Sequence, residues 1–460
     1  MSNNKSKLSG GLWFNILLFN LMGAIAWNVE NMYFNTFLYN SVYAGASAEA
    51  MAGTMAPTTA ISRMVALSAV TAVVTTFLMG TLSDRMKNRK LFISVGYIAW
   101  GVVTALFGFI SRDNVAAIFN LSDDAKILTT TVWAVILMDM LMTFMGSTSN
   151  DSAFNAWVTD VTTTETRPKV ESAFTINGLV AMGIVMGIGS FAQAGTIPYS
   201  IFFLCLGCFV IVCGILGLFL LKEPEHKIVA EEKNASYWSD LFYGFKPSVI
   251  KKNLNLYLIL VAVGLYSIAI QVFFPYLFVY LQYVVLPANP NLLSIATIIT
   301  AVIAIAVAVA GIVILMKLAG KNKALALVPG IVCLVVGLLI LSTSTSLPIM
   351  LIGIAPTVIG YLVLMIQLNA AIRDFIPEGM AGRFQGIRMI FMVLLPMVIG
   401  PWLGDIACRN SNITYVNEYG VETIVPSAAM FLYAAIVALL ALVPLIILIK
   451  NKVFVKQIEE

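Results

Sequence analysis

The chain has 460 residues, of which 60% are hydrophobic and only 11% are charged, and its mean hydropathy is +0.93. Soluble proteins are roughly half apolar and about a quarter charged, so this composition excludes an ordinary soluble domain and indicates a protein of the lipid bilayer. The formal net charge of +4 gives no reason to expect nucleic acid as a partner.

Apolar stretches of membrane-spanning length recur along the whole chain. A spanning helix needs about 20 mostly apolar residues. We predict twelve, over 12–40, 58–82, 91–110, 129–155, 170–194, 198–221, 256–284, 292–316, 324–343, 347–372, 386–406 and 427–449. The first stretch is too long and too rich in Asn for a cleavable signal peptide, so we expect it to be a helix of the mature protein.

The five cysteines do not predict a disulfide framework. Three lie in the helix predicted over 198–221, Cys333 lies in another helix, and Cys408 lies in a loop. Cys205 and Cys208 have the spacing of metal ligands, but the only histidine lies in a distant loop and no carboxylate joins them. We therefore expect these thiols to pack in the core, and we expect neither a metal nor a cofactor.

The basic residues predict the orientation, because short cytoplasmic loops are enriched in Lys and Arg. With both termini in the cytoplasm, the cytoplasmic segments hold 23 of the 27 Lys and Arg residues. We therefore expect a multi-pass protein of the cell membrane with both ends inside.

The longest polar interruption divides the predicted helices six and six. It runs from 222 to 253, so we expect an N-terminal bundle over 1–221, a cytoplasmic linker over 222–253 and a C-terminal bundle over 254–460. "KNR" after the second helix is answered by "KNK" after the eighth, and Asp160 with Arg167 is answered by Asp374 with Arg383. Two parallel halves with a solute site between them are a transporter architecture.

The stretch "GTLSDRMKNRK" at 80–90 connects the second and third predicted helices. Its residues fit the pattern G-x-L-x-D-R-x-x-x-R-[KR], and the chain therefore resembles the major facilitator superfamily. The resemblance implies an all-α membrane protein of twelve helices in two pseudo-symmetric six-helix bundles. It also implies a conformational lock in which Asp84, with Arg85 and Arg89, faces the start of the eleventh helix around Arg383 and Arg388. The alternative is a charged loop that serves only the orientation of the protein.

A second stretch, "NDSAFNAWVTDVTTTETR" at 150–167, resembles the glycoside-pentoside-hexuronide:cation symporters, which include the melibiose permeases. Asp151, Phe154, Thr162 and Arg167 match that pattern, and "VIGPWLG" in the eleventh helix is also similar. The resemblance implies that Asp151 contacts a sugar. Family members that use sodium carry carboxylates on the second helix, whereas here that helix offers only Arg63, which favours protons as the coupling ion.

Ionisable residues inside a membrane are functional candidates, because hydrocarbon disfavours charge. Glu30, Arg63, Asp139 and Asp151 stand out. We predict that Glu30 and Asp139 couple transport to the cation. Glu30 and Arg63 lie at similar depths, and a fixed structural ion pair between them is an equal alternative.

Polar residues gather on one face of the first and of the fourth predicted helix, counting about 100° per residue. The first face holds Asn20, Trp27, Asn28, Asn31 and Asn35, and the second holds Asp139, Thr143, Gly146, Asn150 and Trp157. Asp151 falls outside the second face by this count. In the second half the corresponding polar residues are Tyr266, Gln271, Gln367 and Asn369, which the resemblance places on cavity-lining helices. Amides suit sugar hydroxyls and Trp suits a sugar ring, although Asn also binds helix to helix.

The sequence therefore predicts a secondary transporter that moves a glycoside, sugar or similar polar solute with a cation, H⁺ rather than Na⁺, as a monomer by alternating access. The predicted solute contacts are Trp27, Asn28, Asn31, Asn35, Asp139, Asp151, Trp157, Gln271, Gln367 and Asn369. One alternative is an exporter of drugs or peptides. Others are a membrane-embedded enzyme, for which no H-E-x-x-H, G-x-S-x-G or intramembrane His is present, and a channel, for which no filter-like loop is visible.

Overall fold

The structure is a computed structural model. It describes residues 8–86, 88–162, 166–223, 243–291, 294–321, 324–376, 384, 387–411, 413–416, 422–451 and 453. Within these residues twelve helices have the length and composition to cross a membrane: Gly10–Tyr43, Pro57–Gly80, Arg89–Phe107, Asp124–Val161, Ile176–Gln193, Tyr199–Leu220, Leu254–Ala288, Ile295–Ala319, Ala324–Thr343, Leu347–Ile372, Ile387–Ser411 and Ala429–Lys450. Each overlaps one predicted span, so the predicted all-α class and the twelve spans are confirmed.

The described chain divides into two compact units. One contains the described residues of 1–55 and 70–231, and the other contains those of 56–69, 232–416 and 422–460. The predicted division into an N-terminal bundle, a linker and a C-terminal bundle stays a prediction. Residues 58–69, the first part of the predicted second spanning helix, group with the second unit. Of the predicted linker, residues 224–242 lie outside the described part.

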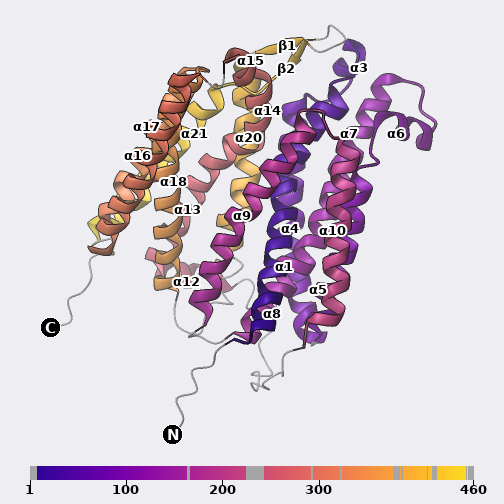
Figure 1. The fold of residues 1–460 in the computed structure, drawn as a ribbon. Helices are drawn as coiled ribbons and strands as arrows, with labels where there is room; N and C mark the ends of the chain where they lie inside the picture. The colour runs from indigo at the N-terminus through magenta and orange to yellow at the C-terminus, as the bar shows by residue number, and fades with distance from the viewer. Residues whose placement is uncertain are drawn as a thin grey trace, which may run out of the picture. The chain divides into compact units, whose positions relative to one another are not determined.

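The first unit contains the elements drawn from indigo to magenta in Figure 1. They are α1 (Gly10–Val29), α2 (Asn35–Phe37), α3 (Ala48–Ala52), most of α4 (Pro57–Met86), α5 (Arg89–Phe107), α6 (Arg112–Phe119), α7 (Asp124–Gly146), α8 (Asn155–Val161), α9 (Arg167–Gln193) and α10 (Tyr199–Leu220). Three wider π-helical turns interrupt these spans: Glu30–Phe34 lies within the first span, Leu38–Tyr43 ends it, and Ser147–Phe154 lies within the fourth. Such turns are frequent at functional sites.

The second unit repeats this order of long helices. Its elements are α12 (Pro247–Lys252), α13 (Leu254–Phe273), α14 (Leu277–Tyr280), α15 (Leu286–Ala288), α16 (Ile295–Lys321), α17 (Ala324–Thr343), α18 (Leu347–Phe375), α20 (Leu395–Ser411), α21 (Ala429–Leu440) and α22 (Leu442–Lys450). Short 3₁₀ turns lie at Tyr243–Phe245 and Phe274–Tyr276, and π-helical turns lie at Leu281–Val285 and Ile390–Leu394. The strands β1 (Thr414–Val416) and β2 (Glu422–Ile424) form a small antiparallel pair that the sequence did not predict.

The two units share a packing pattern. The first spanning helix packs along the fifth in one unit, α1 on α9, and the seventh packs along the eleventh in the other, α13 on α20. Likewise, the third spanning helix packs on the sixth in the first unit, α5 on α10, and the ninth packs on the twelfth in the second unit, α17 on α21. Each unit also places a π-helical turn near the end of its first spanning helix, at Leu38–Tyr43 and at Leu281–Val285. These equivalences support the internal repeat.

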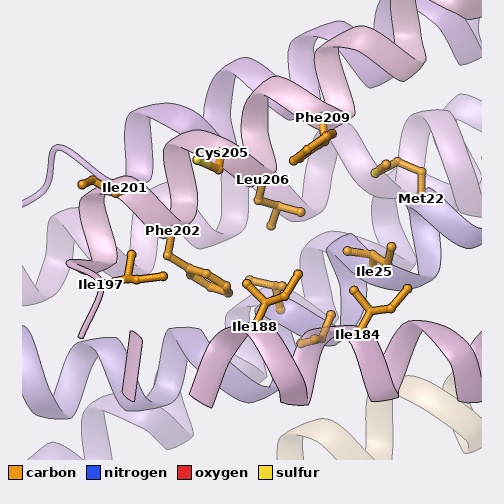
Figure 2. A pocket seen from close by; sticks show the side chains of 12 residues that line it. Met22, Ile25, Ile184, Ile188, Ile197, Ile201, Phe202, Cys205, Leu206 and Phe209 are labelled. Atoms are coloured by element: carbon orange, nitrogen blue, oxygen red, sulfur yellow. The ribbon is translucent and has the colours of Figure 1, made fainter. Parts of the chain in front are cut away.

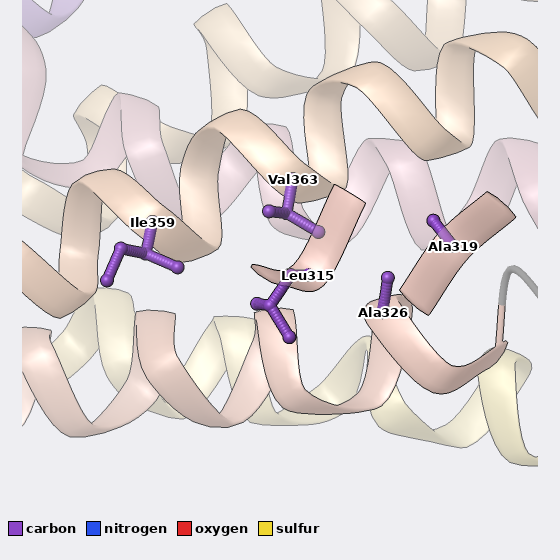
Figure 3. Close-up of a cluster of buried hydrophobic side chains, with 5 residues drawn as sticks. All are labelled: Leu315, Ala319, Ala326, Ile359 and Val363. Atoms are coloured by element: carbon purple, nitrogen blue, oxygen red, sulfur yellow. The ribbon is translucent and has the colours of Figure 1, made fainter. Parts of the chain in front are cut away.

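Both units have large apolar side chains on their surface as well as in their core. The core of the second unit includes Leu315, Ala319, Ala326, Ile359 and Val363, which come from α16, α17 and α18 (Figure 3). On the same α16, however, Ile295, Val302 and Ile305 are 77%, 62% and 65% exposed. Large apolar side chains turned outward along a whole helix suit contact with lipid rather than water.

Candidate functional site

Two buried carboxylates of the first unit lie on neighbouring spans. Glu30, at the start of the first π-helical turn, accepts a hydrogen bond from the Thr143 hydroxyl of α7 at 3.1 Å. Asp139 lies one helical turn before Thr143, and the Glu30 and Asp139 residues are only 7% and 2% exposed. Glu30, one predicted coupling carboxylate, therefore contacts α7, the helix that carries Asp139, the other one.

The amides of the first span are held by their own helix. The Nδ2 atoms of Asn28, Asn31 and Asn35 donate to the carbonyl oxygens four residues earlier, at 2.8, 2.7 and 3.1 Å. A side chain anchored in this way keeps a fixed direction. Each amide retains its oxygen and a second N–H for other partners, because an amide offers two donors and two acceptor sites.

Asp151 lies within the π-helical turn Ser147–Phe154. Its Oδ2 accepts from the Ser147 hydroxyl at 3.1 Å, and Trp27 of α1 lies beside the carboxylate. The count that placed Asp151 off the polar face assumed an ideal α-helix. A π-helical turn takes more residues per turn, so residues within and after it are rotated relative to that count. The structure therefore brings Asp151 together with Trp27 of the predicted polar face of the first span. We call that face the stripe; it consists of Asn20, Trp27, Asn28, Asn31 and Asn35.

Asn150 belongs to a separate hydrogen-bonded chain that crosses three helices. Its Nδ2 donates to the Tyr97 hydroxyl at 2.6 Å, and that hydroxyl donates to the carbonyl oxygen of Phe19 at 2.8 Å. Gly23 of α1 allows this close approach, because a Cβ at that position would meet the Asn150 amide. The chain leaves these polar groups satisfied within the protein, which identifies Asn150 as a packing residue.

Other predicted contacts have protein partners of their own. The Trp157 indole donates to the Lys222 carbonyl at 3.0 Å, and its ring stacks on Phe154. In the second unit Gln367 donates to the Met316 sulfur of α16 at 3.3 Å. Gln271 and Asn369 are half-buried.

The signature loop contributes contacts at one end of the first unit. The Arg89 guanidinium pairs with Asp160 at 2.5 Å, and the backbone N–H groups of Arg89 and Lys90 donate to the Glu223 carboxylate at 2.8 and 2.9 Å. Glu223 thus neutralises the positive N-terminal end of α5. The side chains of Asp84 and Arg85 lie outside the described part, and so does Arg383. Arg388 is half-buried.

An apolar cavity of about 320 Å³ lies between α1, α9 and α10. Figure 2 shows Met22 and Ile25 of α1 facing Ile184 and Ile188 of α9 across it, with Phe202 of α10 beside them. Its lining is almost wholly apolar, and on α1 it lies on the side away from the Asn residues. It therefore does not belong to the polar site.

Sequence reasoning missed Asp405. This residue lies inside the predicted span 386–406, near its end. In the structure it is 2% exposed and accepts hydrogen bonds from the Thr58 and Thr59 hydroxyls. The rule that flagged Glu30 and Asp139 applies equally to Asp405. The described residues contain no group of three or more His, Cys, Asp or Glu that could hold a metal ion.

Comparison with known proteins identifies the class. The profile of the Major Facilitator Superfamily matches residues 16–401, and the chain belongs to this family of membrane transporters.

Solved structures of other transporters share the fold across nearly the whole chain. The nucleoside transporter NupG has a TM-score of 0.59 at 13% identity, with 94% of this chain and 98% of that chain covered. A D-xylose-proton symporter has a TM-score of 0.62 at 14% identity, with 94% and 97% covered. A bacterial homologue of the lysosomal transporter Spinster has a TM-score of 0.57 at 12% identity, with 96% of both chains covered.

A curated relative matches only in part. Multidrug resistance protein 1 of Bacillus subtilis (strain 168) is 24% identical over 172 residues, which are 36% of this chain and 37% of that protein. The family membership indicates a transporter rather than an enzyme.

The close approach of α1 to Asn150 gives a test of packing. Gly23→Val should push the Asn150 amide away from Tyr97 and lower stability by about 1–3 kcal/mol, the usual effect of overpacking. We expect a lower apparent melting temperature in detergent. Gly11→Val is the matched control, since a Cβ there meets nothing within 4 Å. Equal melting temperatures for the two variants would contradict the packing role of Gly23.

Proposed function

We propose that the protein is a secondary transporter that carries a sugar, glycoside or similar hydroxylated solute together with H⁺ by alternating access. The observation that carries the proposal is the pair of buried carboxylates, Glu30 and Asp139, on the two spans that also present the Asn stripe and Asp151. A coupling group and a polar binding surface then share the same helices. In this proposal the protein works as a monomer in the cell membrane with both termini in the cytoplasm.

The chemistry of the stripe favours a hydroxylated solute. Asn28 and Asn31 are half-buried and anchored, so their free amide atoms can exchange donors and acceptors with hydroxyl groups without first being ordered. Trp27 adds a flat apolar face next to Asp151. Asn35 and Asp139 complete the set in the first unit, and we keep Gln271 and Asn369 as contacts from the second. Trp157 and Gln367 carry less weight because their polar atoms already have protein partners.

A proton suits these carboxylates better than a metal cation. A buried carboxylate can become neutral by taking a proton, which removes the cost of a charge in hydrocarbon. The span 58–82 carries Arg63 as its only ionisable residue, so it offers no carboxylate ligand for Na⁺. We therefore assign proton coupling to Glu30 or Asp139.

The signature loop supplies the conformational lock in this proposal. Arg89 is held by Asp160, and Glu223 holds the start of α5, so the loop has a rigid base. On that base Asp84 and Arg85 would meet the start of the eleventh span around Arg388 when the cavity faces outward. A carboxylate at a helix N-terminus is favoured by roughly 0.3–1 kcal/mol, which is small enough to be reversed in each cycle.

An exporter of drugs is the second candidate. The partial match to a multidrug resistance protein and the apolar cavity of Figure 2 favour it. Uptake into proteoliposomes separates the two candidates, using labelled monosaccharides, glycosides and nucleosides beside a lipophilic cationic dye. The proposal expects accumulation of a hydroxylated solute that increases with an imposed pH gradient. Movement of the dye alone would support the exporter instead.

The stripe gives a binding prediction. Asn28→Ala and Asn31→Ala should each weaken binding of the accepted solute by about 1–3 kcal/mol, the cost of leaving a buried partner unpaired. Asn15→Ala is the control, because Asn15 lies on the same helix but donates to the Leu220 carbonyl of α10 at 2.9 Å. It should affect stability and leave the affinity unchanged. An equal loss of affinity at all three positions, measured by titration calorimetry, would argue for helix packing.

The carboxylates give a coupling prediction. Glu30→Gln or Asp139→Asn should abolish accumulation driven by a pH gradient and leave solute exchange measurable, because exchange needs no net proton movement. Asp113→Asn, at an exposed residue of α6, should keep both activities. If both buried variants still concentrate the solute, neither carboxylate carries the proton.

A further inference from the structure

A cluster of hydrogen bonds surrounds Asp405 in the second unit. The Thr58 hydroxyl donates to its Oδ1 at 2.7 Å, and the Thr59 hydroxyl lies 3.1 Å from Oδ1 and 3.0 Å from Oδ2. Arg409, one turn later on α20, forms an ion pair with Oδ2 at 3.0 Å. The carboxylate therefore joins the first turn of α4 to α20 through charge-assisted hydrogen bonds, which are the stronger kind.

Tyr276 reinforces the same contact from the seventh span. Its hydroxyl donates to the Pro401 carbonyl at 2.7 Å and lies 3.2 Å from the Thr58 carbonyl, and Ser62 of α4 contacts the same hydroxyl. Gly404 permits the close approach, because a Cβ there would meet the Val272 carbonyl and the Tyr276 ring. We call Thr58, Thr59, Tyr276, Asp405 and Arg409 the Asp405 clamp.

The helix held by this clamp is shared between the two units. Residues 57–69 of α4 group with the second unit, whereas residues 70–86 group with the first. If the units move relative to each other, a helix divided in this way must either bend or leave one set of its partners. The clamp fastens the end of α4 that lies nearer Pro57, which the predicted orientation places on the outer side of the membrane.

We propose that the Asp405 clamp is the outer gate of the transport cycle, and that Thr58 and Thr59 must leave Asp405 before solute can enter from outside. This inference rests on the proposed function. The ion pair with Arg409 lies within one helix, so it stays intact when α4 moves away, and Arg409 is 47% exposed. Opening then removes hydroxyl hydrogen bonds while the carboxylate keeps its charge partner, which makes the gate reversible.

A labelling experiment tests the gate without any solute. Ser62→Cys is introduced as the reporter in the full-length protein with the five native cysteines replaced by Ser, because Ser62 is buried against the clamp. A membrane-impermeant maleimide is added from outside. Thr58→Val/Thr59→Val should raise the labelling rate roughly 5- to 30-fold, the population change expected when hydrogen bonds of ordinary strength are lost.

Two controls accompany the Val pair. Thr58→Ser/Thr59→Ser keeps both hydroxyls and should label at the reporter's own rate. Thr131→Val removes a buried hydroxyl that donates to the Ile127 carbonyl of its own helix, and it should also label at that rate. An unchanged rate in the Val pair, or an equal increase in all three variants, would overturn the proposal.

A cross-link provides the functional arm. Thr59→Cys/Asp405→Cys, oxidised across the clamp, should stop solute uptake, and a reductant should restore it. Full uptake by the cross-linked protein would refute the gate while leaving the proposed function intact. If the unmodified protein carries no hydroxylated solute, the proposed function fails by itself, and the labelling experiment still decides whether the clamp opens.

Discussion

Hydrocarbon offers no hydrogen-bond partner, and this constraint explains most of what the polar residues of the chain do. A buried donor or acceptor without a partner costs about 1–3 kcal/mol, and an isolated charge costs more. The stripe asparagines therefore bond their own helix, Asn150 bonds Tyr97, and Asp405 gathers two hydroxyls and Arg409. A solute can bind only to polar groups that still have a donor or an acceptor available after their bonds within the protein are made.

The same constraint shapes the backbone. Spanning segments must satisfy their N–H and C=O groups internally, so the described part of the chain builds twelve long helices and has its strands in one short pair between spans. Local π-helical turns and a 3₁₀ turn are departures from the regular α-helix, and two of the π-helical turns contain Glu30 and Asp151. These turns change the direction in which side chains point, and they do so without exposing backbone groups to lipid.

Hydropathy predicted the twelve spans well because length and apolarity alone decide them, and the signature loop was enough to predict the family that the profile match confirms. Side-chain roles were harder to predict. Asp151 seemed to face away from the stripe because an ideal helix was assumed, and a π-helical turn leaves no simple mark in the sequence. Trp157 matched the polar face by spacing, but its partner, the Lys222 carbonyl, is a backbone atom that no pattern reveals. Asp405 lies at the end of a predicted span, where sequence position alone does not separate a buried carboxylate from an exposed one.

Joint movement of solute and proton can be measured directly. Proteoliposomes containing the wild-type protein are suspended in weakly buffered, sodium-free medium with no pH gradient, and the accepted solute is added outside while a pH electrode records the medium. If solute and H⁺ enter together, the medium becomes more alkaline as solute enters, and a protonophore abolishes the change. Solute entry without any pH change, or entry that requires Na⁺, would contradict this joint movement.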